Sequence, residues 1–252
     1  MDGTTAYSSK AEYYARYRWD YAPEAMDLLV ERAGISPESE VADIGSGTGI
    51  LSKHFAGRAA RIFSVEPNAE MRGMAEQMLG KFPAFESING SAEATTLRDR
   101  SVDVIAVAQA IHWFDPEPTR REFLRIARPE CWLALLRNYG TDEEIGKGLW
   151  STYTEGNGAI PPEKVERPPS KPVDFYYGEY PFEALTFPFT ETQSWEVFLG
   201  AVLSASFTPS GDHPRYPRFE SAVREVFEAF SVGGLVETHG NTELQVGKIA
   251  GV

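Results

Sequence analysis

Short apolar runs that are typical of β-strands recur along the chain. Between them lie segments whose apolar residues have helical spacing. Residues 102–107 are almost entirely apolar, which is typical of a central strand buried on both faces. Residues 11–33 carry apolar side chains at helical spacing, so we expect one or two helices there that end at Gly34. The pattern predicts strands over 40–44, 61–65, 84–88, 102–107, 131–138, 182–189 and 242–249, and helices over 49–57, 68–80, 117–127, 193–206 and 216–230.

Alternation of strands and helices predicts a doubly wound parallel α/β sheet, because parallel strands need a crossover connection that is usually a helix. The pattern is interrupted once. Residues 139–179 are rich in proline, glycine and aromatic residues and have no clear period, so we expect an inserted helix with a loop there. The strand–helix pattern then resumes.

The composition of the chain excludes several classes of function. The formal charge of −13 and the pI near 4.8 argue against nucleic acid as a partner, since phosphate binding needs a basic face. We expect no membrane span, because no apolar run approaches ~18 residues, and no secretory signal at the N-terminus, so we predict a soluble cytoplasmic protein. The single cysteine, Cys131, lies in an apolar run and is predicted to be buried. The four histidines have no metal-ligand spacing, so we predict no metal site.

The most informative motif is a glycine-rich turn directly after the predicted strand 40–44. Its glycines stand at 45, 47 and 49. A strand, a tight turn and a helix start bring backbone N–H groups close to a nucleotide-like ligand. The dinucleotide fingerprint would place a third glycine where Ile50 stands, and Asp43 would repel a pyrophosphate, so both residues disfavour NAD or NADP.

Two acids indicate a different cofactor. Asp43, two residues before the first glycine, suits an ammonium group. Glu66 ends the apolar run 61–65, where a carboxylate can accept hydrogen bonds from both ribose hydroxyls. A ligand with an ammonium group and a ribose but no diphosphate matches S-adenosylmethionine.

At this point the sequence resembles the class I S-adenosylmethionine-dependent methyltransferases, and within them the small-molecule branch of the trans-aconitate and ubiquinone/menaquinone methyltransferases. The resemblance spans nearly the whole chain and rests on these segments: Tyr14–Arg18 with Tyr21 and Pro23, Asp43–Gly49, Val65–Asn68, Gly90–Glu93, and Ala108–Asp115 with its Gln-Ala-Ile-His-Trp-Phe-Asp run. It implies a Rossmann-like sheet of seven strands, mostly parallel with the last strand antiparallel, with N-terminal lid helices and an insert after strand five. We expect one domain, 1–252, organised as lid helices 1–33, cofactor-binding core 34–138, substrate-side insert 139–179 and completion of the sheet 180–252.

The resemblance also implies site residues. The expected cofactor-binding residues are Tyr14, Arg18, Asp43, Gly45, Ser46, Gly47, Glu66, Pro67, Met71, Ser91, Ala92, Gln109 and Ala110. Arg18 would pair with the methionine carboxylate, and Met71 would cover an adenine face. Many relatives carry Asp where Ser91 stands. Trp113, Tyr139, Trp150 and Tyr153, with Phe207, would line an aromatic acceptor pocket.

The expected reaction is methyl transfer to a small molecule, either a carboxylate or a hydroxyl. His112 is a candidate general base for a hydroxyl, whereas a carboxylate needs no base. Three alternatives stay open: a quinone- or polyketide-type C- or O-methyltransferase, a non-catalytic S-adenosylmethionine-binding protein, and, disfavoured by its turn, an NAD(P)-dependent oxidoreductase. We expect a monomer or a homodimer.

Overall fold

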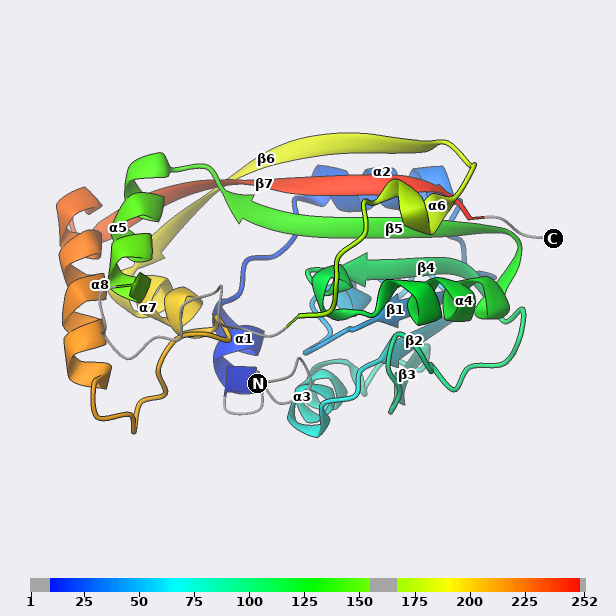
Figure 1. Ribbon diagram of the computed structural model, residues 1–252, viewed down its shortest axis with the longest axis horizontal. Helices are drawn as coiled ribbons and strands as arrows, with labels where there is room; N and C mark the ends of the chain where they lie inside the picture. The colour runs from blue at the N-terminus through cyan, green and yellow to red at the C-terminus, as the bar shows by residue number, and fades with distance from the viewer. Residues whose placement is uncertain (1–9, 155–166, 250–252) are drawn as a thin grey trace. The chain divides into compact units, whose positions relative to one another are not determined.

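The computed structural model describes residues 10–154 and 167–249. Among these residues the chain forms two compact units. The first unit consists of residues 10–19, 138–154 and 188–241, and the second of 20–137, 167–187 and 242–249. Strands β5, β6 and β7 contribute residues to both units (Figure 1). The four-part organisation expected from the sequence remains a prediction.

Strands and helices alternate through the first half of the chain. The strands are β1 (Glu40–Ile44), β2 (Arg61–Val65), β3 (Phe85–Ile88), β4 (Val102–Ala108), β5 (Ala127–Gly140), β6 (Phe182–Ser194) and β7 (Leu235–Lys248). The helices are α1 (Ala11–Tyr17), α2 (Pro23–Ala33), α3 (Ala69–Leu79), α4 (Pro116–Ile126), α5 (Glu143–Thr154), α6 (Asp174–Tyr177), α7 (Trp195–Leu203) and α8 (Tyr216–Phe230), with 3₁₀ helices η2 (Ser52–Phe55) and η3 (Ile111–Trp113).

The strands form one sheet in the order β3-β2-β1-β4-β5-β7-β6. Strand β1 pairs in parallel with both β2 and β4, and β3 and β5 continue the parallel pairing on either side. Figure 1 shows β7 running opposite to β5, with α4 and α6 on one face of this sheet and α2 on the other. The predicted seven-stranded, mostly parallel α/β fold is confirmed.

Local sequence explains several boundaries. Helix α2 begins with Pro23, whose missing N–H needs no partner in the first turn, and ends at Gly34 in the left-handed conformation (φ 61°), as predicted. Helix α8 has the predicted bounds 216–230, and it buries Phe219, Val223 and Phe227 at helical spacing.

Other boundaries differ from the prediction. The expected helix 49–57 is only the 3₁₀ turn η2, because Gly49 and Gly57 both adopt positive φ, which a helix does not allow. Strand β5 begins four residues before the predicted start of 131, because Ala127 still pairs with Val102 beyond a bulge. Strands β6 and β7 are likewise longer than the ranges 182–189 and 242–249.

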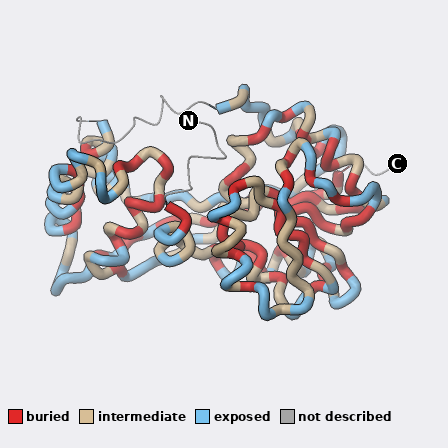
Figure 2. The backbone as a smooth tube through the Cα atoms, turned by 90° about the horizontal axis from the view of Figure 1, so that it is seen from below, coloured by how far each residue is buried: buried red, intermediate tan, exposed pale blue. Residues whose placement is uncertain are grey.

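Each unit has its own core. In the second unit the middle of β4, from Val104 to Val107, is buried throughout, and Cys131 is buried as predicted. Figure 2 colours such buried stretches red. In the first unit α5 packs on α8 and α1 on α7. No helix within 10–154 or 167–249 has both the length and the apolar character needed to cross a membrane.

Candidate functional site

The glycine turn after β1 is held against β2 by its backbone. The N–H groups of Gly45 and Ser46 donate to the Val65 carbonyl at 2.8 and 3.1 Å. Gly45 adopts φ 68°, and a Cβ there would lie 2.8 Å from the Ala110 Cβ. Gly45 is therefore required for packing between the ends of β1 and β4.

Gly47 has a different role. Its φ is 56°, and no atom of the described residues lies within 4 Å of the position that a Cβ would occupy. The turn thus needs glycine at 47 for its backbone conformation, and it leaves open space on that side for a ligand to approach the main chain.

Glu66 follows β2 and is held by two backbone donors. The Gly47 N–H donates to its Oε2 at 3.0 Å, and the Asn68 N–H donates to its Oε1 at 2.9 Å. Burial raises the pKa of the Glu66 carboxyl above its usual value, while these two hydrogen bonds and the Arg72 charge lower it. The carboxylate is oriented beside Gly47, and each of its oxygens keeps a lone pair for a ligand hydroxyl.

Asp43 is fully buried within β1, with 0% of its surface exposed. The Ser52 hydroxyl donates to its Oδ2 at 2.7 Å, whereas Oδ1 has no hydrogen-bond partner among the described residues. Burial raises the pKa of Asp43 to about 7, with a smaller contribution from the Glu66 charge. A buried acceptor without a donor is costly, and a ligand ammonium group would satisfy it.

The start of α3 is organised by two residues that the sequence analysis did not single out. Asn68 is the N-cap, and its side chain accepts from the Met71 N–H at 2.9 Å. The Arg72 Nη1 donates to the carbonyls of Glu66 and Pro67 at 2.9 and 2.8 Å. An Asn before an amphipathic segment is a recognisable cap signal, but the contacts of Arg72 need the folded loop. Met71 itself is buried.

The loop after β4 contains a strained residue. Gln109 adopts φ 58° although it is not glycine, and its N–H donates to the Leu136 carbonyl at 2.9 Å. Such conformations cost about 1–3 kcal/mol and are concentrated at functional sites. Ala110, next to it, is the residue against which Gly45 packs, so the turns after β1 and β4 meet here.

His112 and Trp113 follow on η3, with ring centroids 5.3 Å apart. The Arg167 guanidinium lies over the Trp113 ring at 5.1 Å, a cation–π contact that the sequence analysis missed because the two residues are far apart in sequence. After β3, the backbones of Ser91 and Ala94 form a short bridge, which buries Ala92 between them.

The remaining predicted site residues belong to the first unit. The Arg18 guanidinium lies 5.4 Å from the Tyr14 ring centroid, and its Nη1 donates to the Ser204 hydroxyl at 3.3 Å. Tyr153 packs edge-on against Phe207, with centroids 4.9 Å apart. Trp150 is 52% exposed.

Tyr139 is also exposed on its surface, and its hydroxyl accepts a hydrogen bond from the Asn241 side chain at 3.3 Å. Among residues 10–154 and 167–249, no group of three His, Cys, Asp or Glu side chains is arranged to hold a metal ion.

A parallel sheet in this strand order, with a glycine turn after β1 and an acid after β2, is typical of Rossmann-like folds. Comparison with known proteins shows what this part of the chain is similar to. Residues 42–135 match the family described as "Methyltransferase domain". This part of the chain is therefore similar to methyltransferase domains.

An uncharacterized methyltransferase of Mycobacterium tuberculosis is 36% identical over 145 residues, which cover 58% of this chain and 56% of that protein. The chain thus spans about half the length of the curated relatives that it matches. A solved structure of a putative type II methyltransferase from Anaeromyxobacter dehalogenans has a TM-score of 0.57 at 21% identity, covering 92% of this chain and 97% of that one. The [4+2]-cyclase SpnF has a TM-score of 0.58 at 16% identity, covering 98% and 96%. The two solved structures share the fold with this chain.

Proposed function

We propose that this protein transfers a methyl group from S-adenosylmethionine to a small molecule, at a carboxylate or hydroxyl group. The observation that carries this proposal is the pairing of Glu66 with Gly47: a carboxylate oriented by two backbone N–H groups lies beside a turn that is open to a ligand. The match of residues 42–135 to a methyltransferase domain supports the same cofactor.

The residues of the turn would hold the cofactor by complementary chemistry. Glu66 would accept hydrogen bonds from ribose hydroxyls through its remaining lone pairs, and the unsatisfied Oδ1 of Asp43 would accept from an ammonium group. S-adenosylmethionine, when bound, supplies a methyl group on a sulfonium that is already a good leaving group. The protein then has to align the acceptor and exclude water.

Arg18 would bind the methionine carboxylate. Only one of its five guanidinium N–H donors is used in its hydrogen bond to Ser204, and the Tyr14 ring helps to keep the group in place. Arg18→Ala should therefore weaken the binding of S-adenosylhomocysteine but leave the affinity for its decarboxylated analogue unchanged. Equal losses for the two ligands would assign Arg18 another role.

The effect of replacing His112 should depend on whether the acceptor group is a hydroxyl or a carboxylate. A hydroxyl acceptor needs its proton removed, and a histidine base contributes about 10²–10⁴-fold to such a reaction. For a hydroxyl acceptor, His112→Ala should lower kcat by that factor and remove the pH dependence near neutrality. For a carboxylate acceptor, the rate should fall only modestly and the pH profile should keep its shape.

A second candidate function is binding of the cofactor without methyl transfer. It is favoured by one specific observation: a protein named as a [4+2]-cyclase has the same fold, so the fold does not by itself determine the reaction. Against it stand the cation and aromatic groups that Arg167 and Trp113 bring beside the loop after β4, which a cofactor-only site would not need.

The test combines binding with turnover. Calorimetry with S-adenosylhomocysteine and with NADP should show binding of the first ligand only. Methyl-labelled S-adenosylmethionine with a panel of small carboxylic acids and phenols should then yield labelled product. Glu66→Ala should lower turnover at limiting cofactor, and Glu86→Ala, on the neighbouring strand, is the matched control. Tight binding without turnover across the panel would favour the second candidate, and binding of NADP alone would contradict both.

A further inference from the structure

A groove in the first unit is lined by residues from the start of α5, the end of α8 and the start of β7. Its volume is about 770 Å³, within the range of about 300–1,000 Å³ that is usual for binding sites. All of its lining residues belong to the first unit. Ile145 on α5 also packs against the apolar core of this unit, so part of the groove's lining is continuous with that core.

Three large apolar side chains in the groove are exposed. Phe230, Val232 and Leu235 are 41%, 84% and 46% exposed. The Val232 N–H donates to the Leu235 carbonyl at 2.8 Å, and the Leu235 N–H donates to the Val232 carbonyl at 3.2 Å, so the two backbones form an antiparallel bridge. Gly233 and Gly234 between them have φ values of 61° and 80°, as a tight hairpin turn of this kind requires.

This turn fixes where the apolar side chains point. Directly opposite residues of an antiparallel pair project from the same face, so the bridge holds Val232 and Leu235 on one side of the turn. Keeping two such side chains in contact with water is unfavourable, and exposed apolar patches with a polar rim mark interaction sites. The turn therefore presents an apolar surface to a partner.

The rim of the groove is acidic. Four carboxylates line it: Asp142, Glu143, Glu144 and Glu237. His239 lies 2.9 Å from Asp142 and 3.3 Å from Glu237, and Lys147 on α5 pairs with Glu143 and Glu144 at 3.6 and 2.7 Å. Four carboxylates thus stand against at most two cations, and the groove keeps an excess of negative charge.

We propose that this groove binds a basic amphipathic segment of a partner protein. Its apolar side chains would contact Phe230, Val232 and Leu235, and its lysine or arginine side chains would pair with the surrounding carboxylates. Charge complementarity favours this partner, because it directs association and suppresses partners of like charge. The inference goes beyond the proposed function and does not depend on a bound cofactor.

Two other occupants are disfavoured by their charge. Residues 1–9, 155–166 and 250–252, which lie outside the described part of the chain, hold four acidic side chains and one lysine. A second copy of the chain would bring a formal net charge of −13 towards an acidic groove. Both would be repelled by the rim.

The experiment is fluorescence anisotropy of a labelled synthetic peptide of leucine and lysine, with leucine at helical spacing, titrated with the full chain. The wild type should bind this peptide, and the affinity should fall as salt is added, because salt screens exposed ion pairs. The same peptide with glutamate in place of lysine should not bind. Equal affinity for the two peptides, or no binding of the lysine peptide at low salt, would overturn the inference.

Val232→Ser tests the apolar contact. It should weaken binding of the lysine peptide about tenfold, the factor expected when one valine side chain is no longer buried. Because Val232 is 84% exposed, the variant should fold as the wild type does, which thermal unfolding checks. Val197→Ser replaces an exposed valine of α7 outside the groove and is the matched control, with unchanged affinity.

Glu237→Gln tests the acidic rim. It should weaken binding about two- to fivefold, the range for an exposed ion pair. Glu225→Gln removes one charge from α8 outside the groove and should leave the affinity unchanged. Equal losses in these two variants would indicate attraction to the acidic chain as a whole and overturn the inference, as would wild-type affinity of Val232→Ser. A wild-type dimer in sedimentation that dissociates on Val232→Ser would overturn it in favour of a second copy.

Discussion

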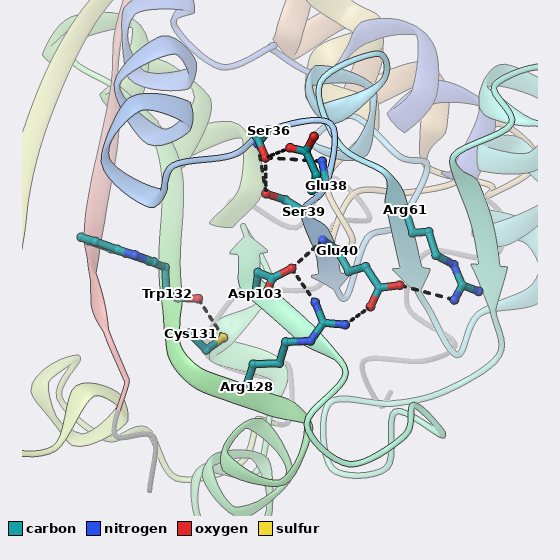
Figure 3. A network of polar contacts seen from close by, with 9 residues as sticks. All are labelled: Ser36, Glu38, Ser39, Glu40, Arg61, Asp103, Arg128, Cys131 and Trp132. Atoms are coloured by element: carbon teal, nitrogen blue, oxygen red, sulfur yellow. Dashed lines mark hydrogen bonds and ion pairs between the residues drawn. The ribbon is translucent and has the colours of Figure 1, made fainter.

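At the amino ends of β1, β4 and β5 oppositely charged side chains meet, whereas the carboxyl ends of β1 and β4 carry strained and unsatisfied groups. Figure 3 shows the amino ends: Arg128 donates to Asp103 at 2.7 Å and to Glu40 at 2.5 Å. Glu40 also pairs with Arg61 at 3.6 Å, and Arg61 pairs with Glu86. The Glu40 N–H donates to the Asp103 carboxylate at 2.8 Å, and this hydrogen bond joins β1 to β4.

The carboxyl ends of β1 and β4 present a different set of groups. Asp43 is buried with an unsatisfied oxygen, Gly47 faces open space, and Gln109 adopts a left-handed conformation. The unsatisfied Asp43 oxygen and the left-handed conformation of Gln109 each cost stability. The comparison indicates that the ion pairs at the amino ends stabilise the sheet, while the carboxyl ends of β1 and β4 carry the groups to which the proposed function assigns binding. Four substitutions test this contrast, from the largest expected effect to the smallest.

Asp43→Asn should change the pH dependence of stability most. The folded-state pKa of about 7 lies above the unfolded value of 3.8, so the folded protein binds more protons between these values. The free energy of unfolding of the wild type should therefore fall as pH rises from about 4 to 7, relative to the Asn variant, by on the order of 4 kcal/mol. Urea unfolding at a series of pH values measures this difference. If the free energies of unfolding of the wild type and the variant change with pH in parallel, the buried Asp43 carboxyl does not cause this pH dependence.

Gly45→Ala should lower the free energy of unfolding by about 2–4 kcal/mol, since it combines a left-handed φ with overpacking. The added Cβ would meet the Ala110 Cβ at 2.8 Å and the Phe114 ring at 2.9 Å. Gly47→Ala, whose Cβ meets no described atom within 4 Å, is the control and should cost only about 1 kcal/mol. Equal destabilisation in denaturant titrations would argue against the packing role of Gly45.

Glu66→Ala should weaken the binding of S-adenosylhomocysteine by about 1.5–3 kcal/mol, typical of a hydrogen bond to a charged group. Stability should change less, because the hydrogen bonds that Glu66 accepts from Gly47 and Asn68 come from backbone N–H groups of the same turn region. Calorimetry and thermal unfolding of the same variant separate the two effects. A loss of stability without a loss of affinity would show that Glu66 has a structural role, like Glu40 and Asp103 at the amino ends of the strands.

Arg128→Met should lower the free energy of unfolding by about 1 kcal/mol, because its ion pairs with Asp103 and Glu40 are partly exposed to solvent. The loss should shrink at high salt. S-adenosylhomocysteine affinity should not change, since Arg128 lies at the amino ends of the strands. Reduced affinity at unchanged stability would contradict the proposed division between the two ends.

Much of this architecture could be predicted from the sequence, because periodicity and turn chemistry are properties of neighbouring residues. The range 216–230 of α8, the stop of α2 at Gly34 and the strand before the glycine turn all follow from local signals. The placement of Glu66 at the end of β2 followed from its spacing from the glycines. The roles assigned to the individual site residues remain predictions.

Other features depend on contacts between residues that are distant along the chain. The extension of β5 to Ala127 is due to its pairing with Val102. The cation over Trp113 comes from Arg167, which is distant from it in the sequence. Neither contact has a local signal, because each is formed only when separate elements pack together.

The sequence by itself determined the order of strands and helices, the glycine turn and the two acids beside it, since each depends on residues within one or two turns of chain. Only the tertiary structure decided that Ser46, Ser52 and Ser64 connect Asp43 to that turn, and that one carboxylate oxygen stays unsatisfied among the described residues. The physical reason is that hydrogen bonding and desolvation are set by the atoms that packing brings together, and a sequence pattern does not fix those distances.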